Sequence, residues 1–258
     1  MNSRTFINMK NTERFTSRVE NYVKYRPHYP VAVIPFLQEE IRLKKDSIIA
    51  DIGAGTGISS QPFLDNGNKV YAVEPNKAMR EMAVKLLGRF PNFEAVDGSA
   101  EDTKLPDASV DLIVVGTAFH WFDQPAATAE FRRIGKEDAW VVLMWNVRKS
   151  KLPFEKAYED ILHKYAINYK DMDHRNVGLE QLVDFFIPGT LVEKRFLNTQ
   201  AFDFTALKGR MLSSSYVPEE GHPSYEPMIK ALEDIFNKYQ QNGMVTFHYD
   251  TALYLGRV

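Results

Sequence analysis

Short apolar runs recur along the first 145 residues of the chain, and each has the length of a buried β-strand. They lie at residues 48–52, 69–74, 93–97, 110–116 and 139–145. Segments with apolar residues at helical spacing fall between several of them, at residues 57–66, 76–88 and 125–136. Strands and helices that alternate in this way form βαβ units, which build a parallel sheet with helices on both faces. The pattern therefore predicts an α/β fold.

The segments on either side of this pattern are predicted to be mainly helical. One helix before the first strand carries apolar residues from Phe15 to Val23, and a second spans residues 31–43. Prolines at positions 27 and 30 separate the two, because proline cannot continue a helix. After residue 145 we expect helices at 153–187, 204–213 and 225–241, and strands at 190–197 and 246–255.

Composition and charge narrow the class of partner. Hydrophobic residues make up 44% of the chain and charged residues 26%, which is ordinary for a globular protein. The net charge of −2 creates no basic field, so we expect neither a nucleic-acid partner nor an anionic membrane surface. No apolar run reaches the ~18 residues that span a bilayer, and the first ten residues lack the apolar core of a signal peptide. We expect a cytoplasmic monomer or homodimer that acts on a small molecule.

The chain contains no cysteine. This excludes disulfides, thiolate zinc sites, iron–sulfur clusters and a cysteine nucleophile. The other metal-ligating residue types are not concentrated at any point, so no metal site is expected.

The strongest local motif follows the first strand and reads Asp51-Ile52-Gly53-Ala54-Gly55-Thr56-Gly57. Glycines at alternate positions allow a sharp turn and let backbone N–H groups approach a ligand closely. We expect a helix to begin at about Gly57, with its positive N-terminal end toward that ligand. Glu74 ends the next strand, and an acid about 20 residues beyond such a turn suits the hydroxyl pair of a ribose. These features predict a pocket for a nucleoside-type cofactor.

The spacing of the glycines separates the candidate cofactors. A dinucleotide fingerprint requires a third glycine where Ile58 stands, which disfavours a nicotinamide-dependent oxidoreductase. The Gly-Lys-Ser/Thr of a Walker A loop is absent.

The pattern Asp-x-Gly-x-Gly-x-Gly resembles motif I of the class I S-adenosylmethionine-dependent methyltransferases. The resemblance implies a Rossmann-like seven-stranded sheet of order 3-2-1-4-5-7-6, with the last strand antiparallel and a helical cap. It implies one methyltransferase domain over residues 1–258: a cap segment at 1–44, a cofactor-binding core at 45–146, and the remaining strands with helical insertions at 147–258. It also implies S-adenosyl-L-methionine as cofactor, held by Asp51, Gly53, Ala54, Gly55, Gly57, Glu74 and Pro75.

A polar turn after the third predicted strand extends the resemblance. In these enzymes that turn holds the adenine, which assigns Gly98, Ser99, Ala100 and Glu101 to the cofactor. Many relatives carry an aspartate where this chain has Ser99, so one hydrogen bond to the adenine is expected to be weaker. Read alone, the segment is an ordinary polar turn.

The segment after the fourth predicted strand reads Thr117-Ala118-Phe119-His120-Trp121-Phe122-Asp123. It resembles the small-molecule methyltransferase group that includes trans-aconitate methyltransferases. Ligands bind at the carboxyl ends of the strands in open α/β sheets, which favours Thr117 as a cofactor residue. His120 is a candidate general base because histidine titrates near neutral pH. Trp121 is a candidate for packing on cofactor or substrate; the alternative for both residues is a structural role.

Two further segments resemble the same group. The first, Tyr22 to Pro30, implies that Arg26 contacts a carboxylate of cofactor or substrate and that Tyr22 and Tyr25 contact substrate. The second, residues 210–218, implies substrate contacts from Arg210, Ser214 and Tyr216. The alternatives are a rigid proline turn and an ordinary serine loop. The basic run at 148–151 is expected to be a solvated loop.

The reaction implied by the resemblance is in-line attack of a small-molecule nucleophile on the sulfonium methyl group. The protein would mainly align the reactants. A carboxylate acceptor needs no base, whereas a hydroxyl or amine acceptor loses a proton, for which His120 is the candidate. The rival hypothesis is a non-catalytic regulatory protein that binds S-adenosylmethionine.

Overall fold

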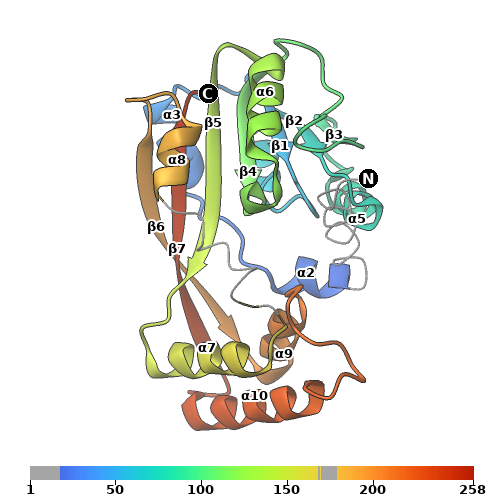
Figure 1. The fold of residues 1–258 in the computed structure, drawn as a ribbon, viewed down its shortest axis with the longest axis vertical. Helices are drawn as coiled ribbons and strands as arrows, with labels where there is room; N and C mark the ends of the chain where they lie inside the picture. Colours follow the sequence, from blue (N-terminus) through green and yellow to red (C-terminus); the bar gives the residue numbers. More distant parts are fainter. Residues whose placement is uncertain (1–17, 168, 170–178) are drawn as a thin grey trace.

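The computed structural model of the protein describes residues 18–167, 169 and 179–258. Its centre is a seven-stranded sheet with the order β3-β2-β1-β4-β5-β7-β6 (Figure 1). The strands are β1 Ile48–Ile52, β2 Lys69–Val73, β3 Phe93–Val96, β4 Val110–Gly116, β5 Gly135–Arg148, β6 Val192–Phe202 and β7 Val245–Gly256. The first five are parallel, and β7 runs antiparallel to both β5 and β6. The predicted α/β sheet and its order are confirmed.

Side chains alternate between two apolar layers, one on each face of the sheet. Ile49 points to the layer of α3 (Val33–Glu40), α4 (Gln61–Asn66) and α5 (Lys77–Leu87). Its neighbour Ala50 and then Ile52 point to the opposite layer, formed with α6 (Gln124–Ile134) and α8 (Leu179–Phe185). Strands covered on both faces read as continuous apolar runs, which is why their positions were predictable from sequence.

A further apolar cluster, separate from these two layers, lies where β6 and β7 extend beyond the other strands. Here α7 (Pro153–Tyr165), α9 (Phe204–Leu212) and α10 (Tyr225–Tyr239) pack around Phe202 and Phe247 from the two strands. Figure 1 shows these helices below the sheet, with α2 (Val19–Tyr25) between them and the rest of the molecule. The cofactor-type motifs and the late helical segments therefore meet around α2.

The structure corrects several predicted boundaries. Residues 55–60 form consecutive turns, and α4 begins only at Gln61, so no helix begins at Gly57. The helix expected to reach residue 136 ends at Ile134, and Gly135 already belongs to β5. The predicted position Phe15 lies outside the described residues. None of the described helices is long and apolar enough to cross a membrane.

Candidate active site

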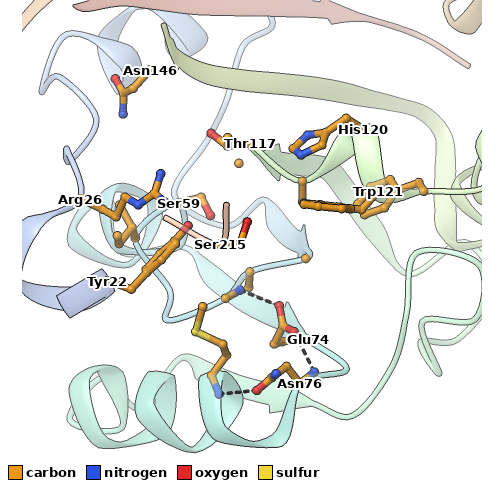
Figure 2. A pocket seen from close by; sticks show the side chains of 18 of the residues that line it. Tyr22, Arg26, Ser59, Glu74, Asn76, Thr117, His120, Trp121, Asn146 and Ser215 are labelled. Atoms are coloured by element: carbon orange, nitrogen blue, oxygen red, sulfur yellow. Dashed lines mark hydrogen bonds between the residues drawn. The ribbon is translucent and has the colours of Figure 1, made fainter. Parts of the chain in front are cut away.

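A cavity of about 320 Å³ opens at the carboxyl ends of β1, β2, β4 and β5 (Figure 2). Residues of α2 and of the segment that follows α9 also line it. Sheet register brings its parts together: Ile52 pairs with Val73, so Gly53 and Glu74 leave adjacent strands side by side. Its size and position are those of small-molecule sites in open α/β sheets.

The three glycines of the turn have different roles, although all have a positive φ. A Cβ on Gly57 would lie 2.3 Å from the Leu87 side chain, so this glycine lets the turn pack on α5. A Cβ on Gly53 would lie 2.6 Å from the Ala118 Cβ, so this glycine allows the end of β1 to lie close to the segment after β4. A Cβ on Gly55 would meet nothing within 4 Å, and Gly55 lines the cavity together with Ala54. Gly55 therefore presents its backbone directly to the cavity.

Glu74 holds this turn in place from the neighbouring strand. Its Oε2 accepts a hydrogen bond from the Gly55 N–H at 2.8 Å, and its Oε1 accepts one from the Asn76 N–H at 2.8 Å. Asn76 in turn caps α5, because its Oδ1 accepts from the Met79 N–H. Burial raises the pKa of Glu74. Each carboxylate oxygen has two lone-pair directions, so each can accept a further bond from a ligand hydroxyl.

Asp51 lies beneath the turn and does not line the cavity. It is completely buried, and its Oδ2 accepts hydrogen bonds from the hydroxyls of Ser59 (2.7 Å) and Ser60 (2.6 Å). Its Oδ1 has no partner among the described residues. Burial raises the pKa of Asp51 to about 6. In this structure Asp51 organises residues 59–60 beneath the glycine turn.

The turn after β3 contributes Ser99, Ala100 and Glu101 to the cavity. Pro75, which follows β2, also lines it. Gly98 does not line it: a Cβ there would lie 2.7 Å from the Thr103 carbonyl oxygen, so its role is to allow a tight turn.

The segment after β4 forms another side of the cavity. His120 and Trp121 lie in a short 3₁₀ helix, Phe119–Trp121, with ring centroids 4.6 Å apart. Both line the cavity with Thr117, whose N–H donates to the Met144 carbonyl on β5. Figure 2 shows His120 and Trp121 across the cavity from Tyr22.

The two segments predicted to contact substrate, 22–30 and 210–218, supply fewer cavity residues than expected. Tyr22, Arg26, Arg210 and Tyr216 line the cavity. Tyr25 does not; its ring packs against α9 so closely that a Cβ on Gly209 would lie 2.0 Å from it. The role of Tyr25 in the structure is helix packing.

Ser214 also lies outside the cavity wall, and its neighbour Ser215 takes that place. The backbone carbonyl and hydroxyl of Ser214 instead receive hydrogen bonds from arginines of the N-terminal segment. The serine run is thus a connection between cap and cavity.

The position of Arg148 contradicts the prediction that residues 148–151 form a solvated loop. Its side chain is 10% exposed, lines the cavity and forms an ion pair with Glu159 of α7. Glu159 also accepts a hydrogen bond from the Tyr169 hydroxyl at 2.7 Å. The guanidinium lies 4.5 Å from the centre of the Tyr158 ring. Aromatic and acidic neighbours from α7 therefore stabilise a buried cation that the local sequence presents as a surface charge.

The part of the cavity that is lined by arginines carries an excess of positive charge. Arg26, Arg148 and Arg210 all line it, and within the described part of the chain only Arg148 has a carboxylate ion-pair partner. Burial, and next the proximity of Arg210, lowers the pKa of Arg26. Arg210 is only 6% exposed. An anionic ligand would relieve this charge.

Sequence reasoning also missed other cavity residues, among them Tyr29, Ser59, Asn146 and Tyr169. Asn146 lies near the carboxyl end of β5, where the strand-end rule could have found it. Its amide donates to the Pro27 carbonyl at 3.2 Å. Tyr29 lies in the segment 22–30 and Ser59 lies two residues after Gly57, so both are close in sequence to predicted site residues, whereas Tyr169 belongs to no motif.

Comparisons with known proteins agree with this geometry. A family model described as a methyltransferase domain matches residues 50–143. An uncharacterized methyltransferase of Schizosaccharomyces pombe is 32% identical over 253 residues, which is 93% of this chain and 95% of that protein. Another, from Mycobacterium tuberculosis, is 32% identical over 148 residues, covering 57% of this chain and 58% of that protein.

The fold is also shared with solved structures. A protein assigned as a type II methyltransferase from Anaeromyxobacter dehalogenans has a TM-score of 0.66 at 22% identity, covering 90% of this chain and 98% of that one. A protein assigned as a methyltransferase of an antibiotic biosynthesis pathway in Anabaena variabilis has a TM-score of 0.64 at 22% identity, covering 91% and 99%.

Proposed function

Because this chain belongs to the class I S-adenosylmethionine-dependent methyltransferase family, we propose that its cavity binds that cofactor and directs methyl transfer to a small acceptor that carries a carboxylate. The observation that carries the proposal is the pair of walls in one cavity. One wall is the Gly55–Glu74 turn, and the other contains two arginines without an acidic partner among the described residues.

The residues of the first wall suit the cofactor. Glu74 keeps acceptor capacity toward the cavity for the two ribose hydroxyls while two backbone N–H groups hold it in place. Gly55 leaves open space next to the backbone, where a ligand can approach closely. Next to this wall, the Ser99–Glu101 turn after β3 offers polar contacts for an adenine, and Trp121 after β4 offers an aromatic contact. When bound, S-adenosylmethionine would supply an electrophilic methyl group, to which the acceptor nucleophile bonds in line while the carbon–sulfur bond breaks and S-adenosylhomocysteine leaves.

The residues of the second wall suit an acidic acceptor. A guanidinium pairs with a carboxylate through two parallel hydrogen bonds, which fixes orientation as well as charge. Arg210 is buried and lines the cavity, and among the described residues its guanidinium donates hydrogen bonds to two serine hydroxyls, at 3.4–3.5 Å. Arg148 is already neutralised by Glu159, so its charge is less available. Arg210 is therefore the main candidate for the acceptor carboxylate.

The protein aligns the acceptor more than it activates it. If the methylated atom is a carboxylate oxygen, no proton needs to leave, and His120 acts by positioning. If it is a hydroxyl on an acidic molecule, His120 lies in the cavity wall where it can take the proton. Both cases share the same anion-binding wall.

The test is a methyl-transfer assay with labelled S-adenosylmethionine and a panel of small carboxylic acids, phenols and amines. We expect label only in acidic acceptors. Alkali releases labelled methanol from a methyl ester and not from an ether, which separates the two cases. Transfer confined to amines or neutral phenols would overturn the acidic acceptor, and binding without transfer to any member of the panel would overturn methyl transfer to this acceptor class.

A further inference from the structure

The two sides of the cavity are physically joined at a place outside it. Residues 213–217, which we name the acceptor wall, follow α9 and contribute Ser215 and Tyr216 to the cavity. Helix α2 contributes Tyr22 and contacts both α9 and α5, the helix that follows Glu74. The junction between α2 and the acceptor wall therefore connects the cofactor half of the proposed site to the acceptor half.

Arg18, the residue before α2, makes the central contact of this junction. It is 9% exposed and does not line the cavity. Its guanidinium donates to the carbonyl oxygens of Ser214 and, at 2.7 Å, Val217, with a longer contact of 3.5 Å to Leu212. It also pairs with Glu219 at 3.4 Å, but that side chain is 65% exposed. The carbonyl contacts, rather than the ion pair, are the buried part of the junction.

Arg26 makes the matching contact from the other end of α2. Its guanidinium donates to the Ser213 carbonyl at 3.0 Å and to the Ser214 hydroxyl at 3.4 Å. Between the two arginines, the Tyr25 ring packs on Gly209 with no room for a Cβ. Helix α2 therefore meets the acceptor wall at both of its ends and packs on α9 through Tyr25.

The chemistry of this junction explains why arginine is needed. The last carbonyls of a helix have no partners within the helix and carry partial negative charge. The carbonyl oxygens of residues 212, 214 and 217, at and just beyond the end of α9, all lie within reach of the Arg18 guanidinium. A guanidinium spreads five donors over a rigid planar fork and can reach carbonyls that lie apart, whereas an ammonium concentrates its three donors on one nitrogen.

We propose that Arg18 is a positioning residue that fixes the acceptor wall to α2, so that cofactor binding orders the acceptor side of the cavity. The proposal rests on the proposed function, because it assumes that the cofactor lies against the glycine turn and α2. A cofactor that holds Tyr22 and α2 in place would, through Arg18, also hold Ser215 and Tyr216. The acceptor site would then be complete only after the cofactor is bound.

Hydrogen–deuterium exchange with S-adenosylhomocysteine as the probe tests this coupling without a known acceptor. In the wild-type protein we expect the probe to slow exchange at least fivefold in peptides covering 19–26 and also in those covering 209–219. In Arg18→Met we expect protection at 19–26 to remain, and exchange at 209–219 to return to within twofold of the probe-free rate. The substitution lies outside both peptides, so the same fragments are compared.

Two control variants separate the carbonyl contacts from charge and from misfolding. Glu219→Gln removes the exposed ion pair with Arg18 and should keep the wild-type pattern. Arg18→Lys keeps the charge without the fork, preserves the fold if Arg18→Met unfolds, and should lose most of the protection at 209–219. Full protection of this segment in both Arg18 variants would mean that the probe orders it directly and would overturn the proposal.

A wild-type protein that binds the probe without protecting 209–219 would also overturn the coupling, while leaving the proposed function intact. A wild-type protein that does not bind the probe, measured by calorimetry on the same sample, would overturn both.

Discussion

The Glu74 carboxylate accepts a hydrogen bond at 2.8 Å from the backbone N–H of Gly55, 19 residues earlier in the chain. This bond joins the acid that follows β2 to the glycine turn that follows β1. Because the second oxygen of Glu74 is held by Asn76, the carboxylate is fixed before any ligand arrives. A group fixed in its binding position loses less entropy when it binds, which favours affinity.

Gly55→Val is expected to abolish cofactor binding while the protein stays folded. The new side chain would meet no protein atom near its Cβ and would therefore occupy cavity space. Gly243→Val is the matched control, because Gly243 also has a positive φ and open surroundings but lies outside the cavity. It should suffer the same backbone strain and bind the cofactor normally. Equal binding by the two variants, measured by calorimetry, would remove Gly55 from the site.

Asp51→Asn is expected to stabilise the fold near neutral pH. Burial raises the pKa of Asp51 from 3.8 to about 6, so the folded state holds its proton more tightly than the unfolded chain. Stability is therefore lost as pH rises from about 4 to about 6, and the loss is complete above that window. Asparagine can accept the same hydrogen bonds from Ser59 and Ser60 without ionising.

The measurement is thermal unfolding of both proteins at two pH values. At pH 7.5 we expect the Tm of Asp51→Asn to rise by about 2–4 °C, the equivalent of about 1 kcal/mol in a protein of this size. At pH 4.5 the gain should be smaller. Asp46→Asn, at an exposed position, is the control and should change little. A gain that is the same at both pH values would contradict ionisation as its cause.

Arg210→Met is expected to raise the KM for an acidic acceptor by about 10-fold or more, since a charge-assisted hydrogen bond is worth about 1.5–3 kcal/mol. The KM for S-adenosylmethionine should change little. Lys208→Met removes a cation from the same helix outside the cavity and should leave both constants near wild type. A KM for the acceptor that does not move in Arg210→Met would show that the carboxylate binds elsewhere.

His120→Ala separates the two kinds of acceptor. For a hydroxyl acceptor we expect the maximal rate to fall by about 10²-fold, and the rise of rate with pH that a neutral histidine base requires should disappear. For a carboxylate acceptor the maximal rate should stay within a few-fold, with the effect on acceptor KM. A full pH–rate profile on both proteins distinguishes these cases. Identical profiles and constants would remove His120 from the mechanism.

The sequence predicts those parts of the site in which a motif directly follows a predicted strand. The turn at Gly53–Gly57, Glu74 and the His120 segment each follow an apolar strand directly, so parallel pairing brings them to one edge of the sheet. Even there, sequence spacing does not distinguish Gly55, which faces the cavity, from Gly57, which packs on Leu87.

The parts that were not predictable depend on contacts between distant segments. Arg148 belongs to a basic run that favours solvent, and it is buried only because Glu159 and Tyr158 of α7 surround it. The sequence predicts that Tyr25, which lies beside Arg26, contacts substrate. Its ring instead packs on α9, because Gly209 has no side chain to occupy that space. These roles follow from how α2, α7 and α9 pack, which periodicity along the chain does not specify.

The most direct test of the account is a calorimetric titration of S-adenosylhomocysteine into the wild-type protein and Glu74→Ala, with Glu94→Ala as control. Glu94 is an exposed acid on β3 that pairs with Lys69 outside the cavity. We predict micromolar binding to wild type and control, and binding to Glu74→Ala that is weaker by about 1–3 kcal/mol, the range for a lost charge-assisted hydrogen bond. Absence of binding to the wild type, or equal affinity in all three proteins, would contradict a cofactor site built on Gly55 and Glu74.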